Sequence, residues 1–191
     1  MTSELTLTLS SGTTITATNN DGTTFSWTPT NCGTNNACAM NGNTAYNSAR
    51  NKFYYSWYAA TADTGTSSMT ESDGDTTGSI CPKNWRLPAN YSVSQTKSFG
   101  TMTDAYGFTV NGGSASSPRA QLETFPFDFY RWDHYQNGGL VNYPNYNGLY
   151  WSSTPYNTNN PYSFLYDSVN IVPQRNNYPK YWGFNIRCIA L

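Results

Sequence analysis

Apolar and polar residues alternate along three short segments at the start of the chain. The segments LTLTL, TTITAT and TTFSWT lie between Leu5 and Thr28, separated by the stretches SSG and NNDG. Strict alternation is typical of strands that bury one face, and Gly, Asn, Asp and Ser favour turns between them. The pattern therefore predicts a β-meander in this part of the chain.

The middle of the chain gives weaker patterns. The aromatic-rich segment from Lys52 to Ala60 predicts a buried strand, and the polar stretch from Asp63 to Gly78 predicts a loop. We expect one helix between Ser92 and Gly107 and a second, short helix between Ser117 and Phe125. Gly100 and several threonines lower the helix propensity of the first segment.

Beyond Phe125, Gly, Pro and Asn interrupt the chain every few residues. The apolar segments between these breaks predict short strands at Tyr150 to Thr154, Tyr162 to Asp167, Val169 to Val172 and Gly183 to Leu191. We see no internal repeat and no linker. The sequence therefore predicts one domain over residues 1–191, of α+β class, mostly β and irregular.

The charge of the chain excludes some classes of partner. Only 11% of the residues are charged, and 10 Lys and Arg face 11 Asp and Glu, for a net charge of −1. Such a chain has no basic footprint, so we expect no nucleic acid partner. No apolar run approaches the roughly 20 residues that span a bilayer, so we also expect no direct membrane insertion.

The four cysteines allow two interpretations. None of them forms a C-x-x-C pair and the chain has one histidine, which argues against a zinc site. Cys32 and Cys38 bracket the short loop GTNNA and favour a disulfide, which leaves Cys81 and Cys188 to pair by elimination. The alternative is four buried free thiols.

Cysteine use also bears on the compartment. An even cysteine count, with few lysines and abundant Thr, Ser and Asn, favours an oxidising setting. The segment MTSELTLTLSSG lacks the basic and apolar regions of a signal peptide, which would also fit a cytoplasmic protein. We expect a secreted or cell-surface protein whose leader or anchor lies outside this sequence.

Three motifs stand in order along the chain: GSICPKNWRLP (Gly78 to Pro88), GLYWSST (Gly148 to Thr154) and GFNIRC (Gly183 to Cys188), with FYYSWYAA upstream. Together they resemble the bacterial Fibrobacter succinogenes major paralogous domain, which is related to the formylglycine-generating-enzyme branch of the C-type-lectin-like fold. The resemblance covers roughly Ala45 to Leu191. It implies a C-type-lectin-like fold with two short helices and a small antiparallel sheet, preceded by an N-terminal β extension over residues 1–44.

The same resemblance suggests roles for several aromatic residues. It makes Trp85 and Arg86, in the motif WRLP, parts of the scaffold. Trp151 and Phe184 are expected in the core. Trp182 neighbours polar loop residues, so its sequence context leaves its exposure open.

The tail from Tyr150 to Cys188 has a narrower resemblance. It is similar to the variable region of the target proteins of diversity-generating retroelements, in which a reverse transcriptase copies a template with errors at adenines. Asn codons are rich in adenine and readily become codons for Tyr, Ser, Asp, His, Ile or Thr. Between Asn142 and Tyr181, 17 of 40 residues are Asn or Tyr. The resemblance implies a variable ligand-binding region over residues 142–188.

The residue types support binding on physical grounds as well. Antibody loops use Tyr for contact area at low entropic cost and Asn and Ser for adaptable hydrogen bonds. An ordinary aromatic surface, whose tyrosines bury against one another, is the alternative. The residues that we expect to contact a ligand are Tyr156, Asn157, Asn159, Asn160, Tyr162, Tyr166, Asp167, Asn170, Arg175, Asn176, Asn177, Tyr178 and Tyr181, with Tyr130, Trp132, His134 and Tyr135 at the flanks.

Catalysis has little support. The single histidine, His134, lies beside Asp133 in a polar segment where a surface role is commoner than a catalytic one. Asp128 and Asp133 are the candidates for a glycosidase pair, but nothing in the sequence fixes their separation. The calcium-dependent sugar motifs of animal C-type lectins are absent, and Glu71 to Asp75 is only a weak cation site.

We therefore expect a non-enzymatic ligand-binding protein with a hypervariable Tyr- and Asn-rich surface, the product of a diversity-generating retroelement. We expect no catalytic residue, no cofactor and no metal. Its ligand is expected to be a protein or glycan on another cell or phage surface. The alternative function is that of a cell-surface glycan-binding module or a carbohydrate-active enzyme.

Overall fold

The computed structural model describes thirteen stretches of the chain, and the arrangement below refers to these. They are residues 15–18, 24–27, 30–31, 44–47, 52–62, 64–81, 84–90, 98–105, 122–123, 134–135, 141–142, 147–167 and 170–190. The elements in chain order are β1 (Ile15–Thr18), β2 (Thr24–Trp27), β3 (Thr30–Asn31), β4 (Thr44–Asn47), β5 (Lys52–Tyr55), α1 (Trp57–Ala60), the 3-10 turn η1 (Glu71–Asp73), β6 (Trp85–Arg86), α2 (Phe99–Ala105), β7 (His134–Tyr135), β8 (Val141–Asn142), β9 (Gly148–Pro155), β10 (Pro161–Tyr166), β11 (Ile171–Arg175) and β12 (Ile189–Ala190).

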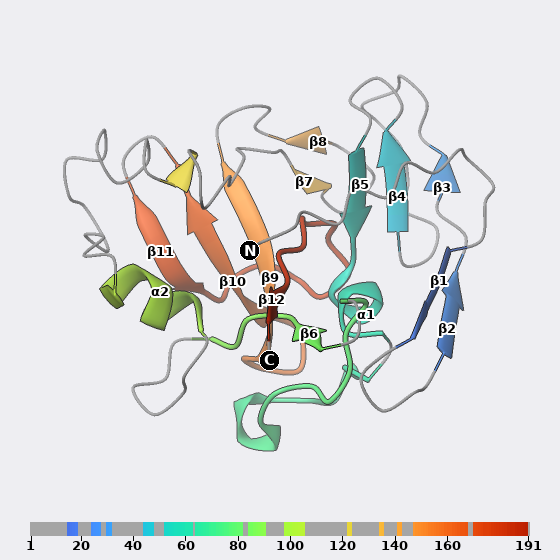
Figure 1. Ribbon diagram of the computed structural model, residues 1–191, viewed down its shortest axis with the longest axis horizontal. Helices are drawn as coiled ribbons and strands as arrows, with labels where there is room; N and C mark the ends of the chain where they lie inside the picture. The colour runs from blue at the N-terminus through green and yellow to red at the C-terminus, as the bar shows by residue number, and fades with distance from the viewer. Residues whose placement is uncertain are drawn as a thin grey trace.

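The strands form small sheets rather than one large one (Figure 1). The sheet orders are β1–β2, β3–β4–β5, β12–β6, β7–β8 and β11–β10–β9. Neighbouring strands are antiparallel, apart from the parallel pair β3 and β4. Within the described stretches the chain is thus α+β and mostly strand, as the sequence predicts, with two short α-helices of which α2 lies in a predicted helix and α1 does not.

The predicted meander is confirmed for two of its three strands. β1 and β2 pair antiparallel, with Ile15 opposite Trp27 and Thr18 opposite Thr24. The first predicted strand, LTLTL, lies outside the described residues. The alternating pattern therefore predicts the pairing wherever the structure describes it.

The predicted strand from Lys52 to Ala60 is wrong in its second half. β5 ends at Tyr55, and the chain turns into α1. Ser56 caps this helix, because its hydroxyl accepts a hydrogen bond from the Ala59 amide at 3.2 Å. A serine before a short alanine-containing segment is a helix-start signal, which the aromatic pattern of the segment hides.

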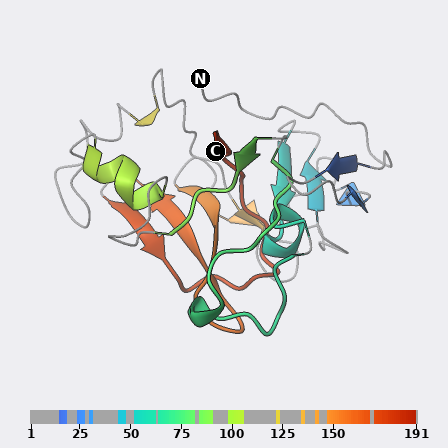
Figure 2. The ribbon, with the colours of Figure 1, turned by 60° about the horizontal axis from the view of Figure 1, so that its bottom comes forward.

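The predicted helix from Ser92 to Gly107 is described only over residues 98–105. The described helix, α2, covers Phe99–Ala105 and lies against β11 in both ribbon views (Figures 1 and 2). Phe99 stacks on Phe164 of β10, with 4.8 Å between the ring centroids. Of the second predicted helix, only Leu122 and Glu123 lie within the described residues.

The sheet β11–β10–β9 carries apolar side chains on both faces. Along β9 and β10 the side chains alternate between two clusters. Leu149 and Trp151 pack into the first cluster, and Tyr150, Phe164 and Tyr166 pack into the second. Every residue of β9 and β10 is consequently buried.

A three-residue segment, Gly183 to Asn185, joins this sheet to β5. The backbone of Phe184 exchanges two hydrogen bonds of 2.9 Å with Tyr55. The next residue, Asn185, donates its backbone N–H to the Leu149 carbonyl at 3.1 Å and accepts from the Trp151 N–H at 3.2 Å. The predicted strand from Gly183 to Leu191 is thus two pieces, this segment and β12.

Two indole groups strengthen the same junction. The Trp57 indole N–H donates to the Ser152 carbonyl at 2.9 Å, and the Trp151 indole N–H donates to the Tyr55 carbonyl at 2.7 Å. The rings of Trp151 and Phe184 stack at 4.0 Å, and both side chains are fully buried. The prediction that these two residues belong to the core is confirmed, whereas Trp85 packs against it half-buried.

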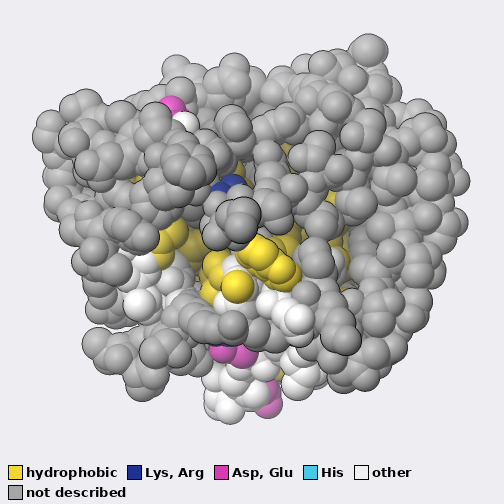
Figure 3. All heavy atoms as spheres, viewed as in Figure 1, with side chains coloured by type: hydrophobic (Ala, Val, Ile, Leu, Met, Phe, Trp, Pro, Cys, Tyr) yellow, Lys and Arg dark blue, Asp and Glu magenta, His cyan; other side chains and the backbone are white. Residues whose placement is uncertain are grey.

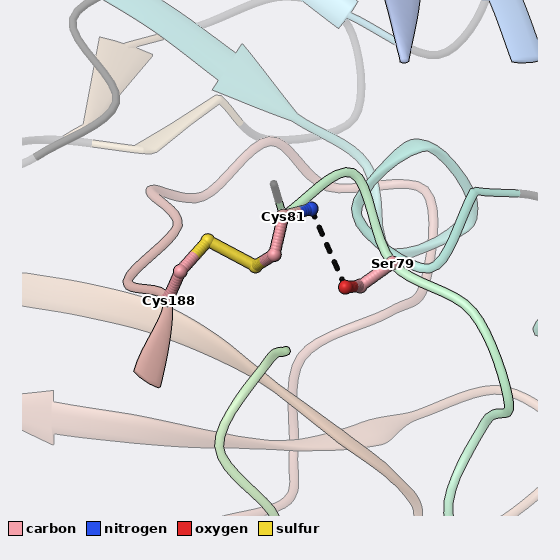
Figure 4. The surroundings of a disulfide bond; sticks show 3 residues. All are labelled: Ser79, Cys81 and Cys188. Carbon is pink, nitrogen blue, oxygen red and sulfur yellow. Dashed lines mark hydrogen bonds between the residues drawn. A yellow bond between two sulfur atoms is a disulfide. The ribbon is translucent and has the colours of Figure 1, made fainter. Parts of the chain in front are cut away.

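A disulfide between Cys81 and Cys188 closes the core, with 5.8 Å between the two Cα atoms (Figure 4). The Cys81 N–H also donates to the Ser79 hydroxyl at 3.3 Å. The bond spans 107 residues and stabilises the fold by about 4–5 kcal/mol in the chain-entropy account. The predicted pairing is confirmed for these two cysteines, and the predicted Cys32–Cys38 bond lies outside the described residues.

Removing either ring of the stacked pair should destabilise the protein strongly. We expect Trp151→Ala and Phe184→Ala each to lower the free energy of unfolding by about 3–5 kcal/mol, because each opens a cavity in a packed interior. Urea unfolding followed by fluorescence and circular dichroism measures the effect. Tyr181→Ser, at an exposed position, is the control and should change stability by no more than about 0.5 kcal/mol. Equal losses in all three variants would contradict this account of the core.

Candidate ligand-binding surface

Two tyrosines stand out as the exposed large hydrophobic side chains of the described residues. Tyr156 is 38% exposed and Tyr181 is 51% exposed. Tyr156 begins the turn between β9 and β10, and Tyr181 lies in the segment that follows β11. The backbone N–H of Lys180 donates to the Asn159 carbonyl at 2.9 Å, so the two segments touch. We call residues 156–160 and 175–181 together the loop surface.

Backbone and side-chain hydrogen bonds fix the turn from Tyr156 to Asn160. The N–H groups of Tyr156 and Asn157 donate to the Asn160 carbonyl at 3.0 and 2.9 Å. The Asn157 side-chain oxygen accepts from the N–H groups of Asn159 and Asn160 at 2.9 and 2.8 Å. Asn157, predicted to contact a ligand, thus uses its side chain to build the turn. The exposed Asn159 and Tyr156 project from a fixed backbone.

Tyr156 rests on a second tyrosine and faces a carboxylate. Its ring contacts the buried Tyr162 ring edge-on at 5.1 Å. The Tyr162 hydroxyl donates a hydrogen bond to the Glu71 side chain, and the Glu71 N–H donates to the Tyr156 carbonyl at 3.1 Å. The pKa of Tyr162 is raised to about 12. Burial is the largest cause, the charge and hydrogen bond of Glu71 come next, and the nearby Tyr156 contributes least.

The other half of the loop surface is built around Tyr178. The Arg175 guanidinium lies over the Tyr178 ring at 5.6 Å. Tyr178 in turn packs on Trp182 at 5.3 Å and edge-on against Phe184 at 5.2 Å. Tyr178 is therefore half-buried against the core, while its neighbour Asn177 is exposed and Asn176 is half-buried.

Lys180 connects the two segments of the loop surface through its backbone and anchors them to the Thr66–Met69 loop through its side chain. It is fully buried, and its ammonium donates to the carbonyls of Thr66 and Met69, both at 2.9 Å. The ammonium also lies over the Trp57 ring at 4.9 Å, and the Lys180 carbonyl accepts from the backbone N–H of Trp57 at 2.8 Å. Burial lowers the pKa of Lys180, and the Asp73 carboxylate acts in the opposite direction.

The structure corrects the prediction at Tyr166 and Tyr162. Tyr166 is fully buried in the second apolar cluster, and Tyr162 is only 7% exposed. Both lie on β10, whose sheet is covered on both faces, so neither face of the strand offers a tyrosine to a ligand. Composition alone cannot separate such tyrosines from exposed ones.

Asp167 and Asn170 lie at the other end of β10. A six-residue strand spans about 20 Å, so roughly that distance separates these residues from Tyr156. The Asp167 carboxylate accepts from the Asn170 N–H at 2.7 Å and so closes the turn between β10 and β11. Their contact with the same ligand stays a prediction.

The predicted flanking residues cannot be placed beside the loop surface. His134 and Tyr135 form β7, which Figure 1 shows near the upper end of β9, away from the turn between β9 and β10. Tyr130 and Trp132 lie outside the described residues.

Acidic side chains occupy the edge of the surface next to η1, at the lower edge of the face in Figure 3. They bond to different partners. Asp73 accepts from the Thr70 N–H at 2.7 Å, and Asp75 accepts from the Thr154 hydroxyl. Among the described residues, no three His, Cys, Asp or Glu side chains come together in a way that would hold a metal ion.

Comparison with known proteins adds nothing to this geometry. No protein-family model, no curated protein and no solved structure matches the chain. Within the described stretches, no helix is long and apolar enough to cross a membrane. The resemblances drawn from the sequence motifs stay predictions.

Sequence reasoning missed the role of Lys180 and the contact between Glu71 and Tyr162. Lys180 is the last lysine of the chain and lies five residues after Arg175. Lysine side chains are rarely fully buried, so nothing in the sequence marks this one as buried and bound to carbonyls. Glu71 lies in a loop far away in sequence, and nothing local connects it with Tyr162.

The titration of Tyr162 tests the contact with Glu71. Between pH 10 and 12 the unfolded chain loses this proton before the folded protein does, so the contribution of Tyr162 to stability falls as the pH rises through this range. We expect Glu71→Gln to lower the pKa of Tyr162, yet to leave it above 10.0 because burial is the larger cause. The difference in tyrosinate absorbance between each protein and its Tyr162→Phe counterpart isolates this group. An unchanged pKa in Glu71→Gln would contradict the contact.

Lys180→Met should destabilise the fold and loosen the loop surface. The change leaves two buried carbonyls without their donor, at about 1–3 kcal/mol each. We expect a loss of roughly 2–6 kcal/mol in urea unfolding, together with faster hydrogen exchange at the amide of residue 180. Ser67→Ala, at an exposed position in the Thr66–Met69 loop, is the matched control. A loss no larger than that of the control would show that Lys180 does not hold these segments.

Proposed function

We propose that the chain is a non-enzymatic ligand-binding protein whose contact residues lie on the loop surface. In this proposal it has a C-type-lectin-like frame, and a diversity-generating retroelement varies the exposed residues. The frame is the core around Phe184 and the disulfide. The exposed Tyr and Asn residues of the loop surface are Tyr156, Asn159, Asn177 and Tyr181.

One observation carries the proposal: exposed Tyr and Asn side chains project from segments whose backbones are fixed by other groups. The Asn157 side chain fixes the first segment and Lys180 fixes the second. The fold therefore does not rely on the exposed side chains, and they are free to change. This separation of frame and contact residue is what a variable site requires.

The chemistry of the surface suits recognition of large ligands. Tyrosine gives a wide contact area with two rotatable bonds, and asparagine donates and accepts hydrogen bonds. Segments that are already ordered before binding lose little entropy when a ligand arrives. The proposed ligand is a protein or glycan on another cell or phage surface, and the proposed setting is secreted or on the cell surface.

The proposal includes no catalytic step. Asp73 and Asp75 bond to a threonine each, and the Lys180 ammonium is enclosed by two carbonyls and an indole ring. Each of these groups binds a structural partner within the described residues, so a structural role is enough to explain its position.

The gene itself tests the proposal. The experiment sequences the 3′ end of the gene and its neighbouring DNA in many cells of the source population. We expect substitutions at adenine-containing codons of Tyr156, Asn159 and Asn177, while Trp151 and Phe184 in the same stretch stay constant. A reverse-transcriptase gene and a near-copy of this 3′ end, differing at adenines, should lie nearby.

Two outcomes would overturn it. Substitutions spread evenly over buried and exposed codons would exclude a variable surface, and a neighbourhood without a near-copy would exclude the retroelement.

A further inference from the structure

Glu71 is an exposed carboxylate held in a fixed position beside an exposed ring. Its backbone N–H donates to the Tyr156 carbonyl, and its side chain accepts from the Tyr162 hydroxyl. A carboxylate has about four lone-pair sites, so one hydroxyl donor leaves most of its acceptor capacity toward solvent. The two tyrosine rings meet edge-on at 5.1 Å, and Tyr156 is 38% exposed.

The electrostatics of this corner are negative. Glu71 and Asp73 both belong to η1, although the Asp73 charge also acts on the Lys180 ammonium, and Asp75 accepts from the Thr154 hydroxyl. The Lys180 ammonium is fully buried against the carbonyls of Thr66 and Met69 and so does not reach Glu71. Arg175 is committed to the face of the Tyr178 ring.

A carboxylate beside an aromatic face suits a cation. The negative face of a tyrosine ring attracts an ammonium or guanidinium group, and a carboxylate accepts charge-assisted hydrogen bonds from the same group. A neutral sugar can also lie on a tyrosine ring, but it gains nothing from the negative charge of Glu71. The charge therefore favours a cationic guest over a glycan.

We propose that Glu71 and Tyr156 form a subsite for one cationic side chain, a lysine or an arginine, of a protein ligand, with the buried Tyr162 supporting the Tyr156 ring. The inference rests on the proposed function, because it takes the Tyr156 end of the loop surface to be where a ligand binds. It adds a contact from outside residues 142–188, since Glu71 belongs to the preceding half of the chain. The subsite thus joins a carboxylate of the frame to a ring of the variable region.

Three matched peptides test the subsite: Ac-Gly-Gly-Lys-Gly-Gly-NH2 and its counterparts with Arg and with norleucine at the centre. Each is titrated into the full chain while the ring signals of Tyr156 and Tyr162 are followed by nuclear magnetic resonance. We expect the Lys and Arg peptides to shift these signals along a saturating curve that salt weakens, and the norleucine peptide to leave them in place.

Variants locate the binding. Glu71→Gln should weaken the Lys peptide by about three- to tenfold, because it removes the charge but keeps a hydrogen-bond acceptor. Tyr156→Leu should weaken it by a similar factor through loss of the ring face. Thr158→Ala, exposed in the same turn, is the control and should bind as the parent protein does. Each variant is used only where its spectrum shows the parent fold.

Each contrary result overturns the subsite. Equal shifts by the norleucine peptide would mean apolar contact, and shifts by a methyl glycoside without shifts by the Lys peptide would mean a glycan site. Unchanged affinity in Glu71→Gln would remove the carboxylate from the subsite. These results are independent of the gene test: a diversified gene with no cation binding leaves the proposed function standing, and cation binding without diversification leaves only the subsite.

Discussion

The backbone pairing of Phe184 with Tyr55 is the constraint on which the rest of the described structure depends. These two residues exchange hydrogen bonds of 2.9 Å, and the next residue, Asn185, bonds to β9. A three-residue segment thus joins β5 to the sheet β11–β10–β9. Trp151 stacks on Phe184 and donates its indole N–H to the Tyr55 carbonyl, so side chains and backbone enforce the same junction. The disulfide at Cys188 fixes the segment a few residues further on.

The loop surface is ordered because it is attached to this junction. Lys180 lies four residues before Phe184, and its ammonium crosses beneath the surface to the Thr66–Met69 loop. Burying an ammonium is costly, and the lowered pKa of Lys180 reflects that cost. Two carbonyl acceptors and the face of Trp57 offset it. Without the junction these partners would not be held in place, and the charge would remain in water.

The sequence predicts the parts of the fold that depend on local pattern. The hairpin of β1 and β2, the strands β9 to β11 and the Cys81–Cys188 bond follow from alternation, from turn residues and from cysteine count. The start of α1 was missed because one capping serine outweighs a run of aromatic residues. Tyr166 was misplaced because Tyr looks the same in sequence on a covered strand as on an exposed loop. Tertiary packing decides that difference: among the described residues, Phe99 of α2 and Leu122 join the cluster that buries Tyr166.

The candidate surface was predictable as a region but not as a set of contacts. A stretch rich in Asn and Tyr marks residues 142–181, yet the structure sorts that stretch by strand position. Residues within β9 and β10 are buried between two clusters, and the residues that reach solvent lie beyond the ends of the strands. At the end near Tyr156, Lys180 and Glu71 both bind the turn, and they come from two different segments of the chain. A permissive surface therefore lies beside the most constrained segment for a physical reason: side chains can change freely only where the backbone that carries them is held by something else.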